Sequence, residues 1–222
     1  TDLELYIYLA TDGTTLYFES ASDLTVKFTS AIEISSKALN ANNLTFENRG
    51  TGKVIFDAQN LSNHFFLNKA NIKTNFENIT FINGNSHCNG GSIRCKEGTF
   101  SISKCHFKNN NSFLDGGAVS NNSNQSSIIS LSRFNGNSAR DGGAILTEVE
   151  MKFEQCIFEN NTASREAAAV AKDANVYFNN CNFFYNRASN YGVAYSSTPE
   201  NEDKPQGVIN GPTEALEQKL PA

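Results

Sequence analysis

The sequence lacks three things: proline in its first 198 residues, clustered basic charge, and any long apolar run. Charged residues make up 18% of the chain, its formal net charge is −5, and no lysine or arginine adjoins another. Binding to nucleic acid or anionic lipid needs a basic patch, so the sequence disfavours those partners. No apolar run approaches the roughly 18 residues of a membrane span, and no basic-then-apolar signal peptide opens the chain. We therefore expect either a mature or excised fragment or a cytosolic protein.

The prolines mark a boundary near the C-terminus. All four lie after residue 198, at Pro199, Pro205, Pro212 and Pro221. Residues 196–222 also hold five acidic residues against two lysines, a net −3 out of the chain's −5. Segments of this composition cannot bury enough apolar surface to fold. We predict that residues 199–222 form a flexible, acidic tail behind a folded domain.

A phrase of about 25 residues recurs in the middle of the chain. Its copies align on a phenylalanine at intervals of 26, 27, 24 and 25 residues, at Phe81, Phe107, Phe134, Phe158 and Phe183. Four copies continue as F-x-x-N, with the asparagine at Asn110, Asn137, Asn161 and Asn186. A small-residue cluster follows eight or nine residues after the phenylalanine, as in G-G-A-V at 116–119 and G-G-A-I at 142–145. Repeats with a fixed period of 20 to 50 residues are typical of solenoids.

The spacing of apolar residues identifies the elements within each copy. Apolar residues stand two apart, as in strands, but the pairs are three apart, so the chain must turn a corner between them at 103–104, 154–155 and 179–180. Each copy then contains three short strands and three corners. We predict an all-β fold, a right-handed parallel β-helix of about eight coils of 20–27 residues. Residues 76–198 carry the repeats, and residues 1–75 are predicted to be earlier coils with shorter turns.

Equivalent residues of successive coils should lie directly above one another, and this explains the choice of residues. The phenylalanines should stack in the interior, and the asparagines should form a ladder in which each carboxamide donates to the next. Paired glycines allow positive φ and close approach of the backbone. Because Ala167 and Ala168 replace them in one copy, at least one of the two positions does not need positive φ in every coil. The candidate motif residues are Phe107, Asn110, Gly116, Gly117, Ala118, Phe134, Asn137, Gly142, Gly143, Ala144, Phe158, Asn161, Phe183 and Asn186.

These alternating tetrapeptides resemble those of the chlamydial polymorphic membrane protein family, which is named for repeated G-G-A-[ILV] and F-x-x-N. The resemblance covers about residues 76–195, with departures at Gly90–Ser92, Ala167–Ala169 and Gly192–Ala194. It implies an autotransporter: a signal peptide, a β-helical passenger that acts as an adhesin toward host cells, and a C-terminal outer-membrane barrel. On this reading the chain is a passenger fragment without signal or barrel. It would lie on the bacterial surface or be secreted after cleavage.

An enzyme is the main alternative, because parallel β-helices also include polysaccharide lyases and hydrolases. Asp115 and Asp141 both precede Gly-Gly, Glu166 stands near the next equivalent position, and Arg140 and Arg165 lie beside them. One coil apart, two carboxylates could stand about 5 Å from each other, as in retaining glycosidases. The competing interpretation is turn chemistry with arginines that neutralise the acids. We favour it because no further cluster of Asp, Lys or Arg defines a substrate cleft.

The five cysteines leave several pairings open. Cys88 and Cys95 flank a Gly-Gly turn and are the candidate disulfide, and Cys156 and Cys181 occupy equivalent positions one coil apart. Parallel stacking holds the Cβ atoms of such a pair slightly too far apart, so we expect buried, reduced thiols at Cys105, Cys156 and Cys181. A zinc site of His87, Cys88, Cys95 and Cys105 fits the ligand types but not a known spacing.

The sequence therefore predicts a non-enzymatic, multivalent adhesin that needs no cofactor. Its expected partner is a receptor protein or glycan on the host cell surface, with self-association through exposed coil edges as a further possibility. A purely structural spacer is the third hypothesis. If binding occurs, its specificity should reside in the letters that change between copies, KNNNSFLD at 108–115 and NGNSARD at 135–141.

Overall fold

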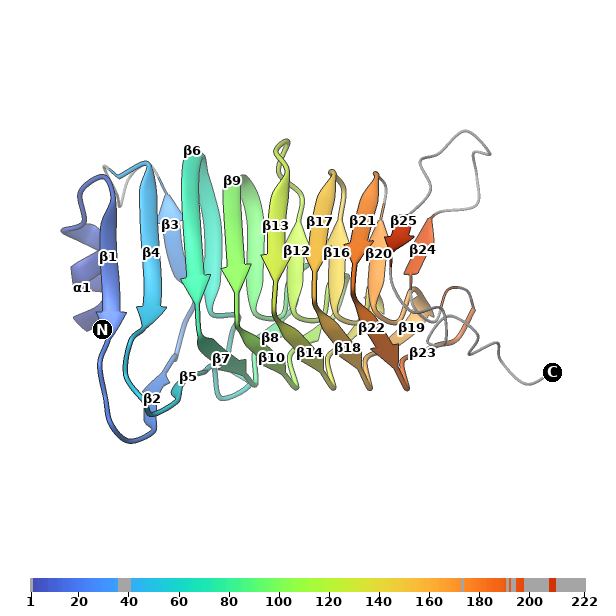
Figure 1. Cartoon of the computed structure of the whole chain (residues 1–222), viewed down its shortest axis with the longest axis horizontal. Helices are drawn as coiled ribbons and strands as arrows, with labels where there is room; N and C mark the ends of the chain where they lie inside the picture. The colour runs from blue at the N-terminus through green and yellow to red at the C-terminus, as the bar shows by residue number, and fades with distance from the viewer. Residues whose placement is uncertain are drawn as a thin grey trace.

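The computed structural model describes residues 2–35, 41–172, 174–190, 192, 195–197 and 208–210. Its strands all pair in parallel and stack into three sheets that run along one rod (Figure 1). The chain is a parallel β-solenoid, as predicted.

The largest sheet, sheet A, has 13 strands and forms two walls of the rod. The long strands β6 and β9 each contribute to both walls, since the two ends of each pair with different neighbours. The strands of sheet A are β1 Thr14–Phe18, β3 Ile32–Ser35, β4 Asn43–Asn48, β6 Phe65–Glu77, β9 Ile93–Ser103, β12 Val119–Asn121, β13 Ser127–Ser130, β16 Ile145–Thr147, β17 Met151–Glu154, β20 Val170–Lys172, β21 Val176–Asn179, β24 Tyr195–Ser197 and β25 Val208–Asn210.

The remaining walls are smaller. Sheet B has seven strands: β2 Leu24–Lys27, β5 Val54–Asp57, β7 Ile79–Ile82, β10 His106–Lys108, β14 Arg133–Asn135, β18 Ile157–Glu159 and β22 Asn182–Phe184. Sheet C has five: β8 Asn85–Ser86, β11 Asn111–Ser112, β15 Ser138–Asp141, β19 Thr162–Glu166 and β23 Arg187–Ala188. Sheet C begins only with the repeats, so the first coils have a simpler cross-section.

Over the described residues the solenoid has about six turns, slightly fewer than the eight coils predicted. Sheet B holds one strand per coil, and its seven strands are joined by six complete turns. The first coils are also longer than predicted: Leu16 pairs with Phe46, 30 residues on, and Leu44 pairs with Thr74. The number of coils is lower than predicted because each early turn contains more residues, and because a helix occupies the N-terminus.

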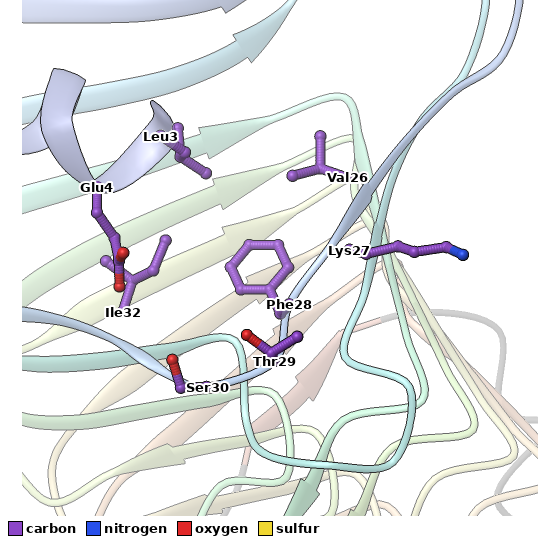
Figure 2. Close-up of a pocket in the computed structure, with 8 residues that line it drawn as sticks. All are labelled: Leu3, Glu4, Val26, Lys27, Phe28, Thr29, Ser30 and Ile32. Carbon is purple, nitrogen blue, oxygen red and sulfur yellow. The ribbon is translucent and has the colours of Figure 1, made fainter. Parts of the chain in front are cut away.

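That helix, α1 Asp2–Tyr8, lies over the first coil (Figure 1). The prediction of β-helix coils over residues 1–75 does not include this helix. Leu3 and Ile7 stand four apart, so one helical face can pack on the coil while Leu5 and Leu9, 57% and 64% exposed, face outward. Figure 2 shows Leu3 beside Val26, Phe28 and Ile32. The cavity they surround holds only about 10 Å³, which is room for one water at most.

Each coil of the repeat region turns its corners with residues in the left-handed conformation. The first corner, predicted at 103–104, 154–155 and 179–180, is confirmed: positive φ falls at Asn78, Lys104, Leu131, Gln155 and Asn180. The second corner has it at Asn83, Asn109, Gly136, Asn160 and Tyr185. The third has it at Gly90, Gly116, Gly142, Ala167 and Gly192. Ten of these fifteen residues are Gly or Asn, which adopt positive φ most readily. Stacking of the coils holds the other five in the same conformation: Lys104, Leu131, Gln155, Ala167 and Tyr185.

The predicted tail falls mostly outside the described residues. Within 199–222 the structure describes Val208–Asn210, which form β25 and pair with β21. The other residues of that segment lie outside the description.

Candidate functional site

The phenylalanines of the F-x-x-N motif form one continuous stack inside the rod. Phe81, Phe107, Phe134, Phe158 and Phe183 are buried, with ring centroids 4.7, 4.9, 5.1 and 5.0 Å apart along the stack. Neighbouring rings are within 9° of parallel. The predicted aromatic stack is confirmed. Its members contribute to stability and cannot contact a partner.

The asparagines of the same motif form the predicted ladder. Asn110 donates through Nδ2 to Oδ1 of Asn137 at 3.0 Å, Asn137 to Asn161 at 2.9 Å, and Asn161 to Asn186 at 2.9 Å. Each carboxamide also donates to the carbonyl of a phenylalanine one coil back, and each Oδ1 accepts a backbone N–H. All four side chains are buried. The ladder satisfies backbone groups that would otherwise be unpaired in the interior.

The two glycines of G-G-A serve different purposes. The first has positive φ at Gly116 and Gly142, and Ala167 keeps the same conformation with φ of 54°. The second, which does not need positive φ, needs space. A Cβ on Gly117 would lie 2.1 Å from the carbonyl oxygen of Gly143, and one on Gly143 would lie 2.3 Å from that of Ala168. The alanines that follow, Ala118 and Ala144, are fully buried. The G-G-A motif, like F-x-x-N, therefore determines the packing of the interior.

The acidic residues before Gly-Gly lie in one rank at the third corner, and each is bound by an arginine of the next coil. Asp141 pairs in register with Glu166, and Asp115 Oδ1 accepts the backbone N–H of Asp141 at 3.2 Å. Arg140 contacts both oxygens of Asp115, at 3.0 and 2.8 Å, and Arg165 contacts both oxygens of Asp141. Asp141 is only 6% exposed. Both carboxylates are thus occupied in a ladder of bidentate ion pairs.

Exposed side chains gather around this ladder on successive coils. We call His87, Cys88, Phe113, Arg140 and Arg165 the corner surface; all five are exposed, and Phe113 is 73% exposed. Backbone hydrogen bonds join their segments, since Arg140 N donates to Leu114 O at 2.7 Å and Asn190 N donates to Arg165 O at 2.9 Å. The residues that differ between repeat copies, rather than the repeated ones, are therefore the residues that reach solvent here.

The cysteines are free thiols, so the candidate Cys88–Cys95 disulfide is not formed. Cys88 is exposed on its loop, whereas Cys95 is buried in sheet A with Sγ 3.5 Å from Glu97 O. Burial raises the pKa of Cys95 to about 12 and that of Cys105 likewise to about 12. Cys156 N lies 3.4 Å from Cys181 Sγ, and both thiols are buried as predicted. No three His, Cys, Asp or Glu side chains gather into a metal site within the described ranges.

His64 is a buried polar residue that the sequence did not predict. His64 is fully buried, with Nε2 2.9 Å from Phe56 O and Nδ1 3.0 Å from Ser92 Oγ. Both contacts are satisfied if Nε2–H donates to the carbonyl and the serine hydroxyl donates to Nδ1. Burial lowers the pKa of His64 to about 4, so the ring is neutral near pH 7. His64 stands where the repeats have Ala118 and Ala144, but its copy lacks the motif that would have revealed the equivalence.

Comparison of the chain with protein-family models, curated proteins and solved structures finds no match. Among the described residues, no helix combines the length and apolar character needed to cross a bilayer.

Proposed function

We propose that this chain is a surface-exposed adhesin module, the β-helical passenger of an autotransporter, which binds host cells through exposed side chains that stand between the repeated motifs on successive coils. The observation that supports it best is the division of roles within each repeat. Phe107, Asn110 and Gly117 are buried, while Phe113 of the same copy and Arg140 of the next copy are exposed. A rod of this kind displays similar sites at one-coil intervals, and simultaneous contacts raise avidity without a deep pocket.

The corner surface has the composition of a protein or glycan contact. Aromatic residues and arginine are enriched at the centres of interfaces. Phe113 is a large exposed ring, and Arg140 and Arg165 are held in fixed orientations by Asp115 and Asp141. Ordering these side chains before binding reduces the entropy lost on contact.

The ion pairs also favour this proposal over an enzyme. A retaining glycosidase needs one carboxylate free to attack the substrate and a carboxylic acid to protonate the leaving group. Asp115 and Asp141 each have both oxygens bound to an arginine and one oxygen bound to a backbone N–H of the next coil. Such contacts support a structural role for the two acids.

Self-association would use the sides of the rod rather than its N-terminal end. At the N-terminal end α1 packs over the first coil (Figure 1), and a covered edge does not pair with another chain.

Binding of the fluorescently labelled chain to cultured epithelial cells, measured by flow cytometry, tests the proposal. Phe113→Ser with Arg140→Ser should lower binding at least fivefold, whereas Leu61→Ser, at another exposed apolar residue, should leave it unchanged. Equal losses in both variants, or no binding by the parent chain, would contradict the adhesin. An enzyme would instead turn over a glycan and lose that turnover in Asp115→Asn with Asp141→Asn. A spacer would show neither activity.

A further inference from the structure

A cleft of about 380 Å³ lies on the outer face of sheet B, over β5, β7 and β10. In these strands Phe56, Phe81 and Phe107 point into the core, so the residues on either side of each point outward. The outward residues form two ranks in register, Ile55–Thr80–His106 and Asp57–Ile82–Lys108. The volume is in the range of small-ligand sites.

The floor and rim of the cleft differ in chemistry. Ile55 and Ile82 provide an apolar floor and are partly exposed, although they face outward from the sheet. Lys53 and Lys108 are exposed on the lining, one at the start of β5 and one at the end of β10. Asn83 and Asn109 add two carboxamides. A ligand in this cleft could pack apolar C–H groups on the floor, form hydrogen bonds to the carboxamides and place anionic groups beside the two lysines.

Among the residues that line the cleft, His106 has a ring nitrogen, Nε2, without a hydrogen-bond partner in the described part of the chain. Its Nε2 is screened from solvent and forms no hydrogen bond to any described residue. Burial, followed by the positive charges of Arg133 and Lys108, lowers the pKa of His106, and Lys53 acts in the same direction. Glu159 opposes them, but it is bound to Arg133. The surroundings of His106 are therefore positive in a chain of net charge −5.

The carboxylate nearest the cleft, Asp57, already has hydrogen-bond partners within the chain. Asp57 Oδ1 accepts hydrogen bonds from Asn83 Nδ2 and from the backbone N–H of Gln59, both at 2.9 Å. Neither Lys53 nor Lys108 has an ion-pair partner in the described part of the chain. The two cations are thus available to an anionic ligand.

We propose that this cleft binds an acidic saccharide, a sugar that carries carboxylate or sulfate groups. Ile55 and Ile82 would pack against the C–H face of a sugar ring, Asn83 and Asn109 would contact hydroxyls, and Lys53 and Lys108 would hold the anionic groups at the two ends. His106, on the lining beside Lys108, would lie close to the charge of the bound anion. The cleft lies on sheet B, away from the corner surface, so this inference stands or falls separately from the adhesin proposal.

Isothermal titration calorimetry on the intact chain tests the inference with three probes: a heparin-derived tetrasaccharide for sulfate, tetragalacturonate for carboxylate, and maltotetraose as the neutral sugar. We expect at least one acidic probe to bind and the neutral probe not to bind. Lys53→Ala with Lys108→Ala should weaken binding at least tenfold. The matched control, Lys73→Ala with Lys152→Ala, removes the same charge from exposed positions of sheet A and should change affinity less than twofold.

Equal weakening in the two double variants would overturn the proposal, because it would mean attraction to net charge alone. Binding of neither acidic probe, or equal binding of maltotetraose, would also overturn it. A second readout follows His106 by NMR during pH titration. The bound anion should offset the charges of Lys53, Lys108 and Arg133 and raise the pKa of His106, and a His106 ring unaffected by saturating ligand would contradict its place in the site.

Discussion

In the repeat region, residues 76–190, aromatic rings follow one another within a rank and lie almost parallel, and steep pairs such as Phe153 and Phe158, at 75°, occur only between ranks. The described ring pairs within the N-terminal region, residues 2–75, all join different ranks and meet at 46–74°. Phe107 and Phe134 are 4° from parallel, but Phe18 and Phe56 meet at 74°. Phe28 and Phe56 meet at 51°. Both arrangements are favourable for aromatic rings. The difference arises because a constant repeat returns the same side chain to the same place in each coil.

The two regions also satisfy their buried polar groups differently. The repeat region uses one device four times, the asparagine ladder from Asn110 to Asn186. The N-terminal region uses single contacts, such as His64 with Phe56 O and Ser92. A ladder couples each coil to the next, whereas a single contact couples only its own neighbours. Repetition therefore provides cooperativity along the rod, and the N-terminal coils rely on α1 to close their end.

The largest expected effect comes from filling the tightest point of the repeat. Gly117→Ala would place Cβ 2.1 Å from Gly143 O and 2.6 Å from Ser138 O, so two coils must separate. We expect a loss of about 4 kcal/mol in the free energy of unfolding, measured by urea denaturation. Gly13→Ala, in the N-terminal region, meets no atom within 4 Å and carries only the strain of positive φ, about 1 kcal/mol. Similar losses in both variants would contradict this account of the coil spacing.

Asn110 belongs to the buried ladder, whereas the adjacent Asn111 is exposed, so substitutions at the two positions compare the interior with the surface. Asn110→Ala would remove three buried hydrogen bonds, to Gly84 N, Phe81 O and Asn137 Oδ1, for a loss of about 3 kcal/mol. Asn111→Ala removes exposed contacts to Asn85 and Ser138 and should cost less than about 0.5 kcal/mol. Urea denaturation of both variants makes the comparison. If the ladder did not stabilise the fold, the two variants would lose equally little unfolding free energy.

Acid should act on the N-terminal region through His64. Its pKa is about 4 in the folded chain and near 6.5 when unfolded, so the unfolded chain binds the extra proton first. Stability is complete above pH 6.5 and falls as the pH drops toward 4, by up to about 3 kcal/mol. Unfolding free energies at pH 7 and pH 4.5 should show this fall in the parent chain and a smaller one in His64→Leu. The same fall in both would assign it to other groups.

The smallest effect would come from restoring the first glycine in the copy that has Ala167–Ala169 in place of Gly-Gly-Ala. Ala167 has φ of 54°, a conformation in which an alanine is strained by about 1 kcal/mol and a glycine is not. Ala167→Gly should therefore raise the free energy of unfolding by roughly 0.5–1 kcal/mol, visible as a higher midpoint in urea. A lower midpoint would mean that the methyl group contributes more by packing than it costs in strain.

The sequence predicted the parts of the fold that the repeat determines. The period predicted parallel coils, the three-residue gap predicted the corner at Lys104, and the repeated asparagine predicted the ladder. Where no repeat exists, the local pattern was ambiguous: Leu3, Leu5 and Ile7 alternate like a strand, and the helix was chosen because an open end of the solenoid needs cover. Coil lengths near Phe46 could not be counted for the same reason.

The surface was harder to predict than the core. The variable corner at Phe113 and Arg140 was predicted from the letters that change between copies, and the ion pairs agree with the structural interpretation of Asp115 and Asp141. The cleft beside His106 was missed, because its floor and rim come from three coils, among them residues before the first F-x-x-N copy. Only the register of the sheet brings Lys53 and Lys108 to one place.

The central claim is that the repeated motifs build the interior and leave recognition to the residues between them. Hydrogen exchange of asparagine side-chain amides, followed by NMR, tests it most directly. We expect the Nδ2 protons of Asn110, Asn137 and Asn161 to exchange orders of magnitude more slowly than that of Asn111 on the surface. Equal, fast exchange at all four would contradict the claim, because it would mean that the motif asparagines are open to solvent and to partners.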